Sequence, residues 1–103
     1  MNGKPYLVYY WHEALDDEEE ESLVINLERD YAPVTVVDAV NEEAVYAYMQ
    51  AEIWSPNGEA RELIESLGLT HTSMSIGDVL YDIREKVYYK CVTFGFLRVD
   101  VVR

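Results

Sequence analysis

The spacing of apolar positions changes several times along the chain, and each change predicts a different element. Residues 5–11 are almost entirely apolar, with β-branched and aromatic side chains, which predicts a first strand in a central position of a sheet. Residues 23–27 fit either a short strand or a helical turn. The N-terminal part of the chain is therefore expected to contribute strands.

A clearer strand is predicted over residues 32–40, where apolar and polar positions alternate. Alternation places Val34 and Val36 on one face of this strand and Val37 on the other. Pro33 lacks an N–H, so we expect it at the start of the strand or on a sheet edge.

Helical spacing follows directly, and it predicts two helices. Asn41 is suited to cap a helix over residues 41–53, whose apolar positions are Val45, Tyr48, Met49 and Ile53. The proline and Asn-Gly pair in residues 54–58 should break this helix. A second helix is predicted over about residues 59–67, and Gly68 is suited to end it.

After residue 75 the apolar period becomes two, which predicts a three-stranded antiparallel meander. Its strands are expected at residues 76–82, 86–93 and 96–102, with a turn at residues 83–85. Strands, two helices and then a meander predict an α+β domain over residues 1–103, with both helices packed on one side of an antiparallel sheet. A small, partly open barrel formed by the C-terminal strands is the alternative.

Acidic residues are concentrated in the first half of the chain. The whole sequence has 20 acidic and 8 basic residues, for a formal net charge of −12. Six of the acids are consecutive: Asp16, Asp17, Glu18, Glu19, Glu20 and Glu21. Such a run is either a solvated loop or a docking surface for a basic partner.

This charge also excludes several classes of function. It opposes direct binding to nucleic acid or to an anionic membrane surface, and no apolar stretch approaches the length of a membrane-spanning helix. A lone Cys91 forbids an internal disulfide, which agrees with a cytoplasmic location.

One segment concentrates side chains that could carry chemistry. Residues 71–78 read His-Thr-Ser-Met-Ser-Ile-Gly-Asp, which supplies an imidazole, three hydroxyls and a carboxylate. A hydrolase would use Ser73 or Ser75 as nucleophile, His71 as base and Asp78 to orient it. A structural connection explains the segment better, with hydroxyls bonded to backbone groups and Gly77 permitting the bend into the next strand.

Metal and cofactor sites are not expected. The two histidines and the lone cysteine do not have the spacing of a zinc site, and the acidic run lacks the alternation of a calcium loop. No glycine-rich phosphate loop is present. We therefore expect no metal, no cofactor and no enzymatic activity.

Aromatic residues are abundant, with nine tyrosines and two tryptophans. Neighbouring tyrosines on a strand point to opposite faces, so some aromatic surface should be exposed. Because aromatic side chains are favoured at protein interfaces, Tyr9, Trp11 and Trp54 are candidate partner-binding residues. Packing at the margin of the sheet is the alternative.

Three segments together resemble a group of small phage- and plasmid-borne proteins. They are residues 54–61 (Trp-Ser-Pro-Asn-Gly-Glu-Ala-Arg), residues 67–79 (Leu-Gly-Leu-Thr-His-Thr-Ser-Met-Ser-Ile-Gly-Asp-Val) and residues 94–96 (Phe-Gly-Phe). Ile76 stands where the group has valine. The resemblance covers about residues 54–96 and implies a mobile-element origin, with no activity to transfer.

Together these observations predict a non-enzymatic accessory protein in the cytoplasm of a host cell. We expect it to bind another protein with a basic surface. The most specific version of this hypothesis is that the protein mimics nucleic acid and inhibits a host factor. Two alternatives stay open: an assembly module that forms a homodimer through strand edges, and a small hydrolase that uses residues 71–78.

Overall fold

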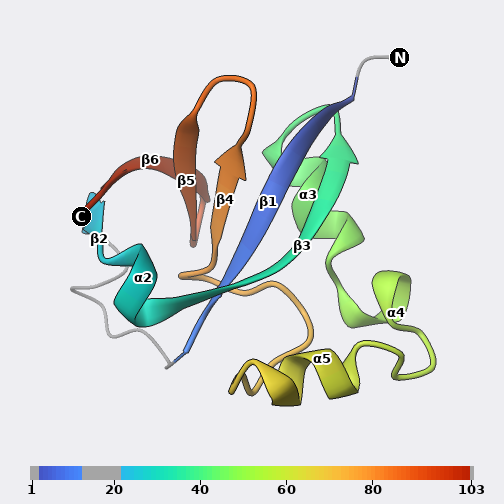
Figure 1. Ribbon diagram of the computed structural model, residues 1–103. Helices are drawn as coiled ribbons and strands as arrows, with labels where there is room; N and C mark the ends of the chain where they lie inside the picture. Colours follow the sequence, from blue (N-terminus) through green and yellow to red (C-terminus); the bar gives the residue numbers. More distant parts are fainter. Residues whose placement is uncertain (1–2, 13–21, 103) are drawn as a thin grey trace.

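The computed structural model describes residues 3–12 and 22–102, and it has the predicted α+β fold (Figure 1). Six strands and four short helices follow one another along the described chain. They are β1 (Lys4–Trp11), β2 (Val24–Ile25), α2 (Leu27–Asp30), β3 (Tyr31–Ala39), α3 (Glu42–Tyr48), α4 (Ala51–Trp54), α5 (Arg61–Ser66), β4 (Val79–Asp82), β5 (Val87–Val92) and β6 (Gly95–Val101). None of these helices is long and apolar enough to cross a membrane.

The strands form one sheet in the order β2-β6-β5-β4-β1-β3. Strand β1 lies between β3 and β4, so its predicted central position is confirmed. The C-terminal meander is also confirmed, because β4, β5 and β6 are antiparallel neighbours. The short β2 departs from the predicted antiparallel sheet, since it pairs with β6 in parallel.

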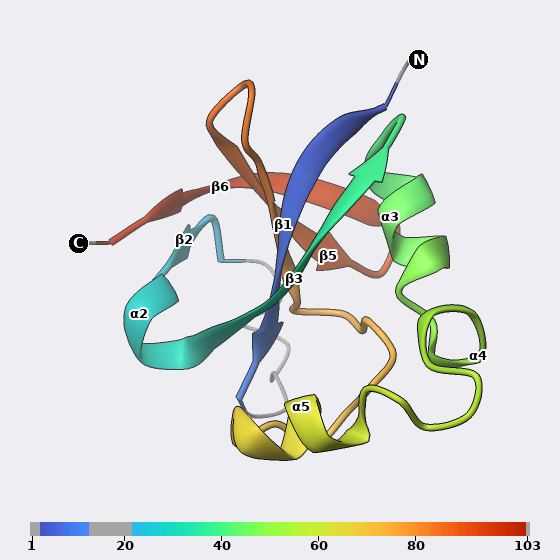
Figure 2. The same ribbon diagram turned by 45° about the vertical axis from the view of Figure 1, so that its right-hand side comes forward.

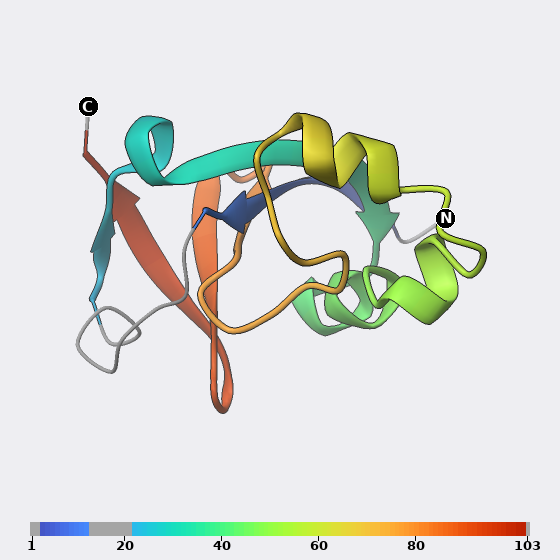
Figure 3. The same ribbon diagram turned by 90° about the horizontal axis from the view of Figure 1, so that it is seen from below.

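The larger hydrophobic core lies on one face of the sheet, under α3 and α5. It contains Tyr6, Val8 and Tyr10 from β1, together with Val45, Met49, Ile64 and Met74 from the covering segments. Side chains of α3 and α5 belong to this core and Trp54 of α4 packs against it, and Figure 3 shows the connection from α5 to β4 running between α3 and α5. The prediction that helices pack on one side of the sheet therefore holds for these three.

A second, smaller cluster lies on the other face of the sheet. Its buried members are Ile25, Tyr31, Val79 and Val99, and the partly buried side chains of Tyr9, Trp11, Leu27, Tyr88 and Val101 pack against them. Leu27 comes from α2, which lies beside β2 at the opposite end from α5 (Figure 3). The sheet is therefore covered on both faces, although unequally.

The helix predicted over residues 41–53 is interrupted. Asn41 caps α3 as expected, because its Oδ1 accepts from the N–H of Ala44 at 2.9 Å. Gln50 then takes an extended conformation, and a separate turn, α4, follows. The break is stabilised by the connection to β4, where the N–H of Met74 donates to the Met49 carbonyl at 3.1 Å.

Two predicted strands are present but differ in detail from the prediction. In β3 the register shifts by one residue, because Val8 pairs with Thr35 but Tyr9 pairs with Pro33. This bulge turns Val37 towards the core and leaves Val36 56% exposed. The strand predicted over residues 76–82 starts only at Val79, because a turn occupies the preceding residues.

Candidate functional site

The carboxylate of Asp78 holds the start of β4 to the end of β1. Asp78 is 1% exposed, and its Oδ1 accepts from the N–H of Trp11 at 2.8 Å. Its Oδ2 accepts from the N–H of Ser75 at 2.8 Å. One side chain therefore joins the first strand to the connection that precedes β4.

His71 completes the surroundings of this carboxylate. Its Nε2 lies 2.9 Å from Oδ2 of Asp78, and its ring stacks on the ring of Tyr10 with centroids 4.6 Å apart. Burial raises the pKa of Asp78, while the hydrogen bond and charge of His71 and the two backbone N–H groups oppose that rise. The buried carboxylate of Asp78 is thus the acceptor, and the half-buried imidazole of His71 is its partner.

The serines of the segment bond to backbone groups, as a structural connection requires. Ser73 Oγ accepts from the N–H of Ala51 at 2.9 Å, and Ser75 Oγ donates to the Ser73 carbonyl at 3.1 Å. Within residues 3–12 and 22–102, no hydrogen bond joins His71 to a serine hydroxyl. The imidazole of His71 is therefore bonded to a carboxylate but to no serine hydroxyl of the described residues.

Replacing Ser73 with alanine should lower the free energy of unfolding by about 1 kcal/mol, because the first N–H of α4 loses its acceptor. Ser75→Ala should cost less, since its hydroxyl is exposed and only bonds locally. Urea unfolding of the two variants measures the difference. If Ser73→Ala and Ser75→Ala were equally stable, the hydrogen bond from Ala51 to Ser73 would not hold the connection against α4.

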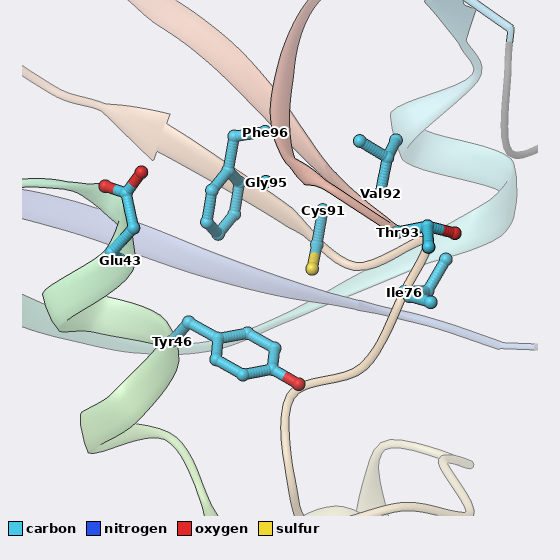
Figure 4. Close-up of a pocket in the computed structure, with 8 residues that line it drawn as sticks. All are labelled: Glu43, Tyr46, Ile76, Cys91, Val92, Thr93, Gly95 and Phe96. Carbon is cyan, nitrogen blue, oxygen red and sulfur yellow. The ribbon is translucent and has the colours of Figure 1, made fainter.

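An apolar pocket opens on the other side of the same connection. It has a volume of about 270 Å³, and its lining residues are Glu43, Tyr46, Ile76, Cys91, Val92, Thr93, Gly95 and Phe96. Figure 4 shows the rings of Tyr46 and Phe96 on either side of the Cys91 thiol, with the Glu43 carboxylate beside Phe96. This arrangement can accept an apolar side chain next to a positive charge.

The backbone of the connection fixes one wall of this pocket. The N–H of Gly77 donates to the Cys91 carbonyl at 2.8 Å, and the N–H of Cys91 donates to the Asp78 carbonyl at 2.8 Å. Gly77 has a φ of 99°, which a residue with a side chain rarely adopts. Ile76 is therefore held beside β5, where it is 45% exposed.

Phe94 is an exposed aromatic residue in the chain segment that carries two of the pocket's lining residues. It lies in the two-residue loop between β5 and β6, next to the lining residues Thr93 and Gly95, and it is 98% exposed. Loops of this length favour asparagine, aspartate and glycine, so the turn itself does not require phenylalanine. An aromatic ring at the tip of the hairpin is free to contact a partner.

The predicted partner-binding residues do not form one surface, although Tyr9 and Trp11 both pack against the second cluster. The acidic residues Asp16 to Glu21 lie outside the described residues. Tyr9 packs near Tyr88, with ring centroids 6.4 Å apart, and Trp11 meets Tyr31 edge-on at 4.7 Å. Trp54 packs against the larger core, on the opposite face of the sheet.

The residues of the pocket were missed by sequence reasoning. The sequence pattern predicts a strand at Ile76 and a helix at Tyr46, and nothing in it indicates that α3 and the β5–β6 hairpin approach each other. A phenylalanine where a tight hairpin calls for a turn residue is the one local signal at this site. Among the described residues, no cluster of three metal-ligating side chains occurs.

Comparisons with protein-family models, with curated proteins and with solved structures find no match to this chain. The evidence for a function therefore comes from the geometry of the site.

Proposed function

We propose that the protein binds another protein through the tip of the β5–β6 hairpin and the pocket beside it. The observation that carries this proposal is Phe94, an aromatic side chain that is 98% exposed beside an apolar pocket. Aromatic anchors contribute strongly to protein interfaces because they bury a large area with few rotatable bonds. Binding, without a catalytic step, is the function that this surface supports best.

The partner is expected to present an apolar side chain beside a lysine or arginine. Tyr46, Ile76 and Phe96 supply apolar contacts within the pocket, and Glu43 supplies a carboxylate at its rim. The net charge of −12 favours approach of a basic surface over an acidic one. The charge of the chain and the lining of the pocket thus favour the same partner chemistry.

We further propose that the protein works in the cytoplasm of a cell that hosts a phage or plasmid. The lone Cys91 and the resemblance of residues 54–96 to proteins of mobile elements support this setting.

Selection of a phage-displayed library of random peptides on the immobilised protein tests the binding site. The selected peptides should carry an aromatic or aliphatic residue next to lysine or arginine. Their affinity for Phe94→Ser should fall about thirtyfold, which corresponds to loss of about 2 kcal/mol for an aromatic anchor. Ile83→Ser, which removes an exposed apolar residue from the other hairpin turn, is the matched control.

A paired substitution tests the charge. Glu43→Gln should weaken the peptides severalfold at low salt and reduce the salt dependence of binding, whereas Glu65→Gln on α5 should leave both unchanged. Peptides that bind Phe94→Ser and Glu43→Gln as tightly as the original protein would overturn the proposed site. Failure to select any peptide above the background of an uncoated surface would overturn the binding function.

A further inference from the structure

Strand β3 forms a free edge of the sheet. It pairs with β1 alone, and no other described strand lies on its outer side (Figure 2). Pro33 and the bulge at Val34 disturb the first half of the strand, because a proline cannot donate and a bulge interrupts pairing. The regular stretch from Thr35 to Ala39 remains available along this edge.

The direction of its backbone groups follows from the ladder. The N–H of Ile83 donates to the Pro5 carbonyl at 3.3 Å, so Pro5 directs its carbonyl towards the β4 side of β1. Tyr6 is the next residue and therefore faces β3, where its partner is Val37. The N–H and C=O groups of Val36 and Asp38 consequently point to the open side of the edge.

A groove runs beside these outward groups. It has a volume of about 250 Å³ and is lined by residues 35–38 together with Tyr48 and Trp54. The indole N–H of Trp54 donates to the Thr72 carbonyl at 3.1 Å, which fixes the ring in place. Tyr48 is exposed. An apolar side chain can therefore enter a preformed space next to the edge, at little cost in ordering the protein.

We propose that this edge binds an extended, basic segment of a partner protein as a seventh strand. Backbone hydrogen bonds to Val36 and Asp38 would hold the segment, and an apolar side chain would lie between Tyr48 and Trp54. Asp38 is exposed, and no described lysine or arginine forms an ion pair with it, so it can face a lysine or arginine of the segment.

Charge decides between this partner and a second copy of the chain. Another copy carries the same formal net charge of −12 over its whole chain and would be repelled, whereas a basic segment would be attracted. The edge shares no residue with the pocket at the hairpin tip. Either surface can therefore bind, or fail to bind, without the other.

Amide hydrogen exchange, followed by NMR, tests strand addition directly. The probe is a synthetic peptide of alternating valine and lysine with both ends blocked. When about nine-tenths of the protein is bound, exchange at Val36 and Asp38 should slow about tenfold, because exchange then proceeds from the free fraction. The control peptide has the same sequence with alternate backbone nitrogens methylated, so it carries the same charge but cannot extend the sheet.

Two substitutions at one position separate backbone from side-chain effects. Val36→Pro removes an outward N–H and should weaken binding of the peptide about tenfold, as followed by isothermal titration calorimetry. Val36→Ala keeps the N–H and should bind within about threefold of the original protein. If Val36→Pro fails to fold, the methylated peptide still decides the question.

Three results would overturn the proposal. They are unchanged exchange at Val36 and Asp38, equal protection by the methylated peptide, and protection that rises with protein concentration in the absence of peptide. The second result would show electrostatic attraction alone, and the third would show pairing with a second copy.

Discussion

Asp78→Ala is expected to lower the free energy of unfolding by about 3–5 kcal/mol, since it removes the buried acceptor of two part-buried backbone N–H groups and creates a small cavity. The donors are the N–H groups of Trp11 and Ser75, each 2.8 Å from a carboxylate oxygen of Asp78. His71 would lose its partner as well. The loss should therefore exceed that of a typical surface substitution several times over.

Urea unfolding followed by circular dichroism measures this effect. Asp100→Ala is the matched control, because Asp100 is an exposed aspartate on β6, and its replacement should change stability by less than about 0.5 kcal/mol. A loss below about 1 kcal/mol for Asp78→Ala would show that the carboxylate does not hold β1 to the connection before β4.

Met74→Ala should be the second most damaging change, with a loss of about 2–5 kcal/mol. Met74 is 1% exposed and belongs to the larger core. Its N–H donates to the Met49 carbonyl at the break between α3 and α4. Truncating the side chain removes apolar contacts at the point where the connection enters the core, and the surrounding strands leave little room to collapse.

Ile76→Ala is the paired experiment, because it removes an apolar side chain two residues further along the same connection. Ile76 is 45% exposed, so the loss of stability should stay within about 1 kcal/mol. Thermal and urea unfolding of both variants compare the two positions. Similar losses of stability for the two variants would contradict the conclusion that Met74 packs in the core while Ile76 lines the pocket.

The elements that the sequence predicts correctly are those with strong local signals. A run of β-branched and aromatic residues is enough to identify β1, and the punctuation by Gly68 is enough to end the helix before it. Gly68 has a φ of 72°, and the N–H of Leu69 donates to the Ile64 carbonyl at 3.0 Å, as a terminating glycine predicts. These features depend on neighbours within a few residues.

The failures arise where a distant segment decides the local structure. Helical spacing continues through Met49, yet the helix breaks there because Met74 and Ser73 supply hydrogen bonds to the interrupted backbone. Likewise, the alternation that begins at Ile76 does not form a strand before Val79, since the N–H of Gly77 donates to the carbonyl of the distant Cys91 and the N–H of Cys91 donates to the Asp78 carbonyl. No local pattern contains those partners.

The candidate site shows the same limit. The sequence indicated that some aromatic surface would be exposed, as it is at Tyr46, Tyr48 and Phe94. It also indicated that the hydroxyls of residues 71–78 would bond nearby backbone groups, which holds for Ser75, whereas Ser73 accepts from the N–H of the distant Ala51. It did not indicate that Ile76 and Tyr46 would face one pocket, because they come from segments that only the sheet brings together. The bulge in β3, which exposes Val36 beside a free edge, also has no clear signal in the residues around it.

The central claim is tested most directly by NMR, by measuring which amide chemical shifts of the protein change when a selected peptide binds. We expect the largest shifts at Tyr46, Ile76 and residues 92–96, with smaller changes elsewhere, because these residues line the pocket or form the hairpin tip beside it. Shifts concentrated on the opposite face of the sheet, around Tyr9, Trp11 and Tyr88, would contradict the claim that the protein binds its partner through the hairpin tip.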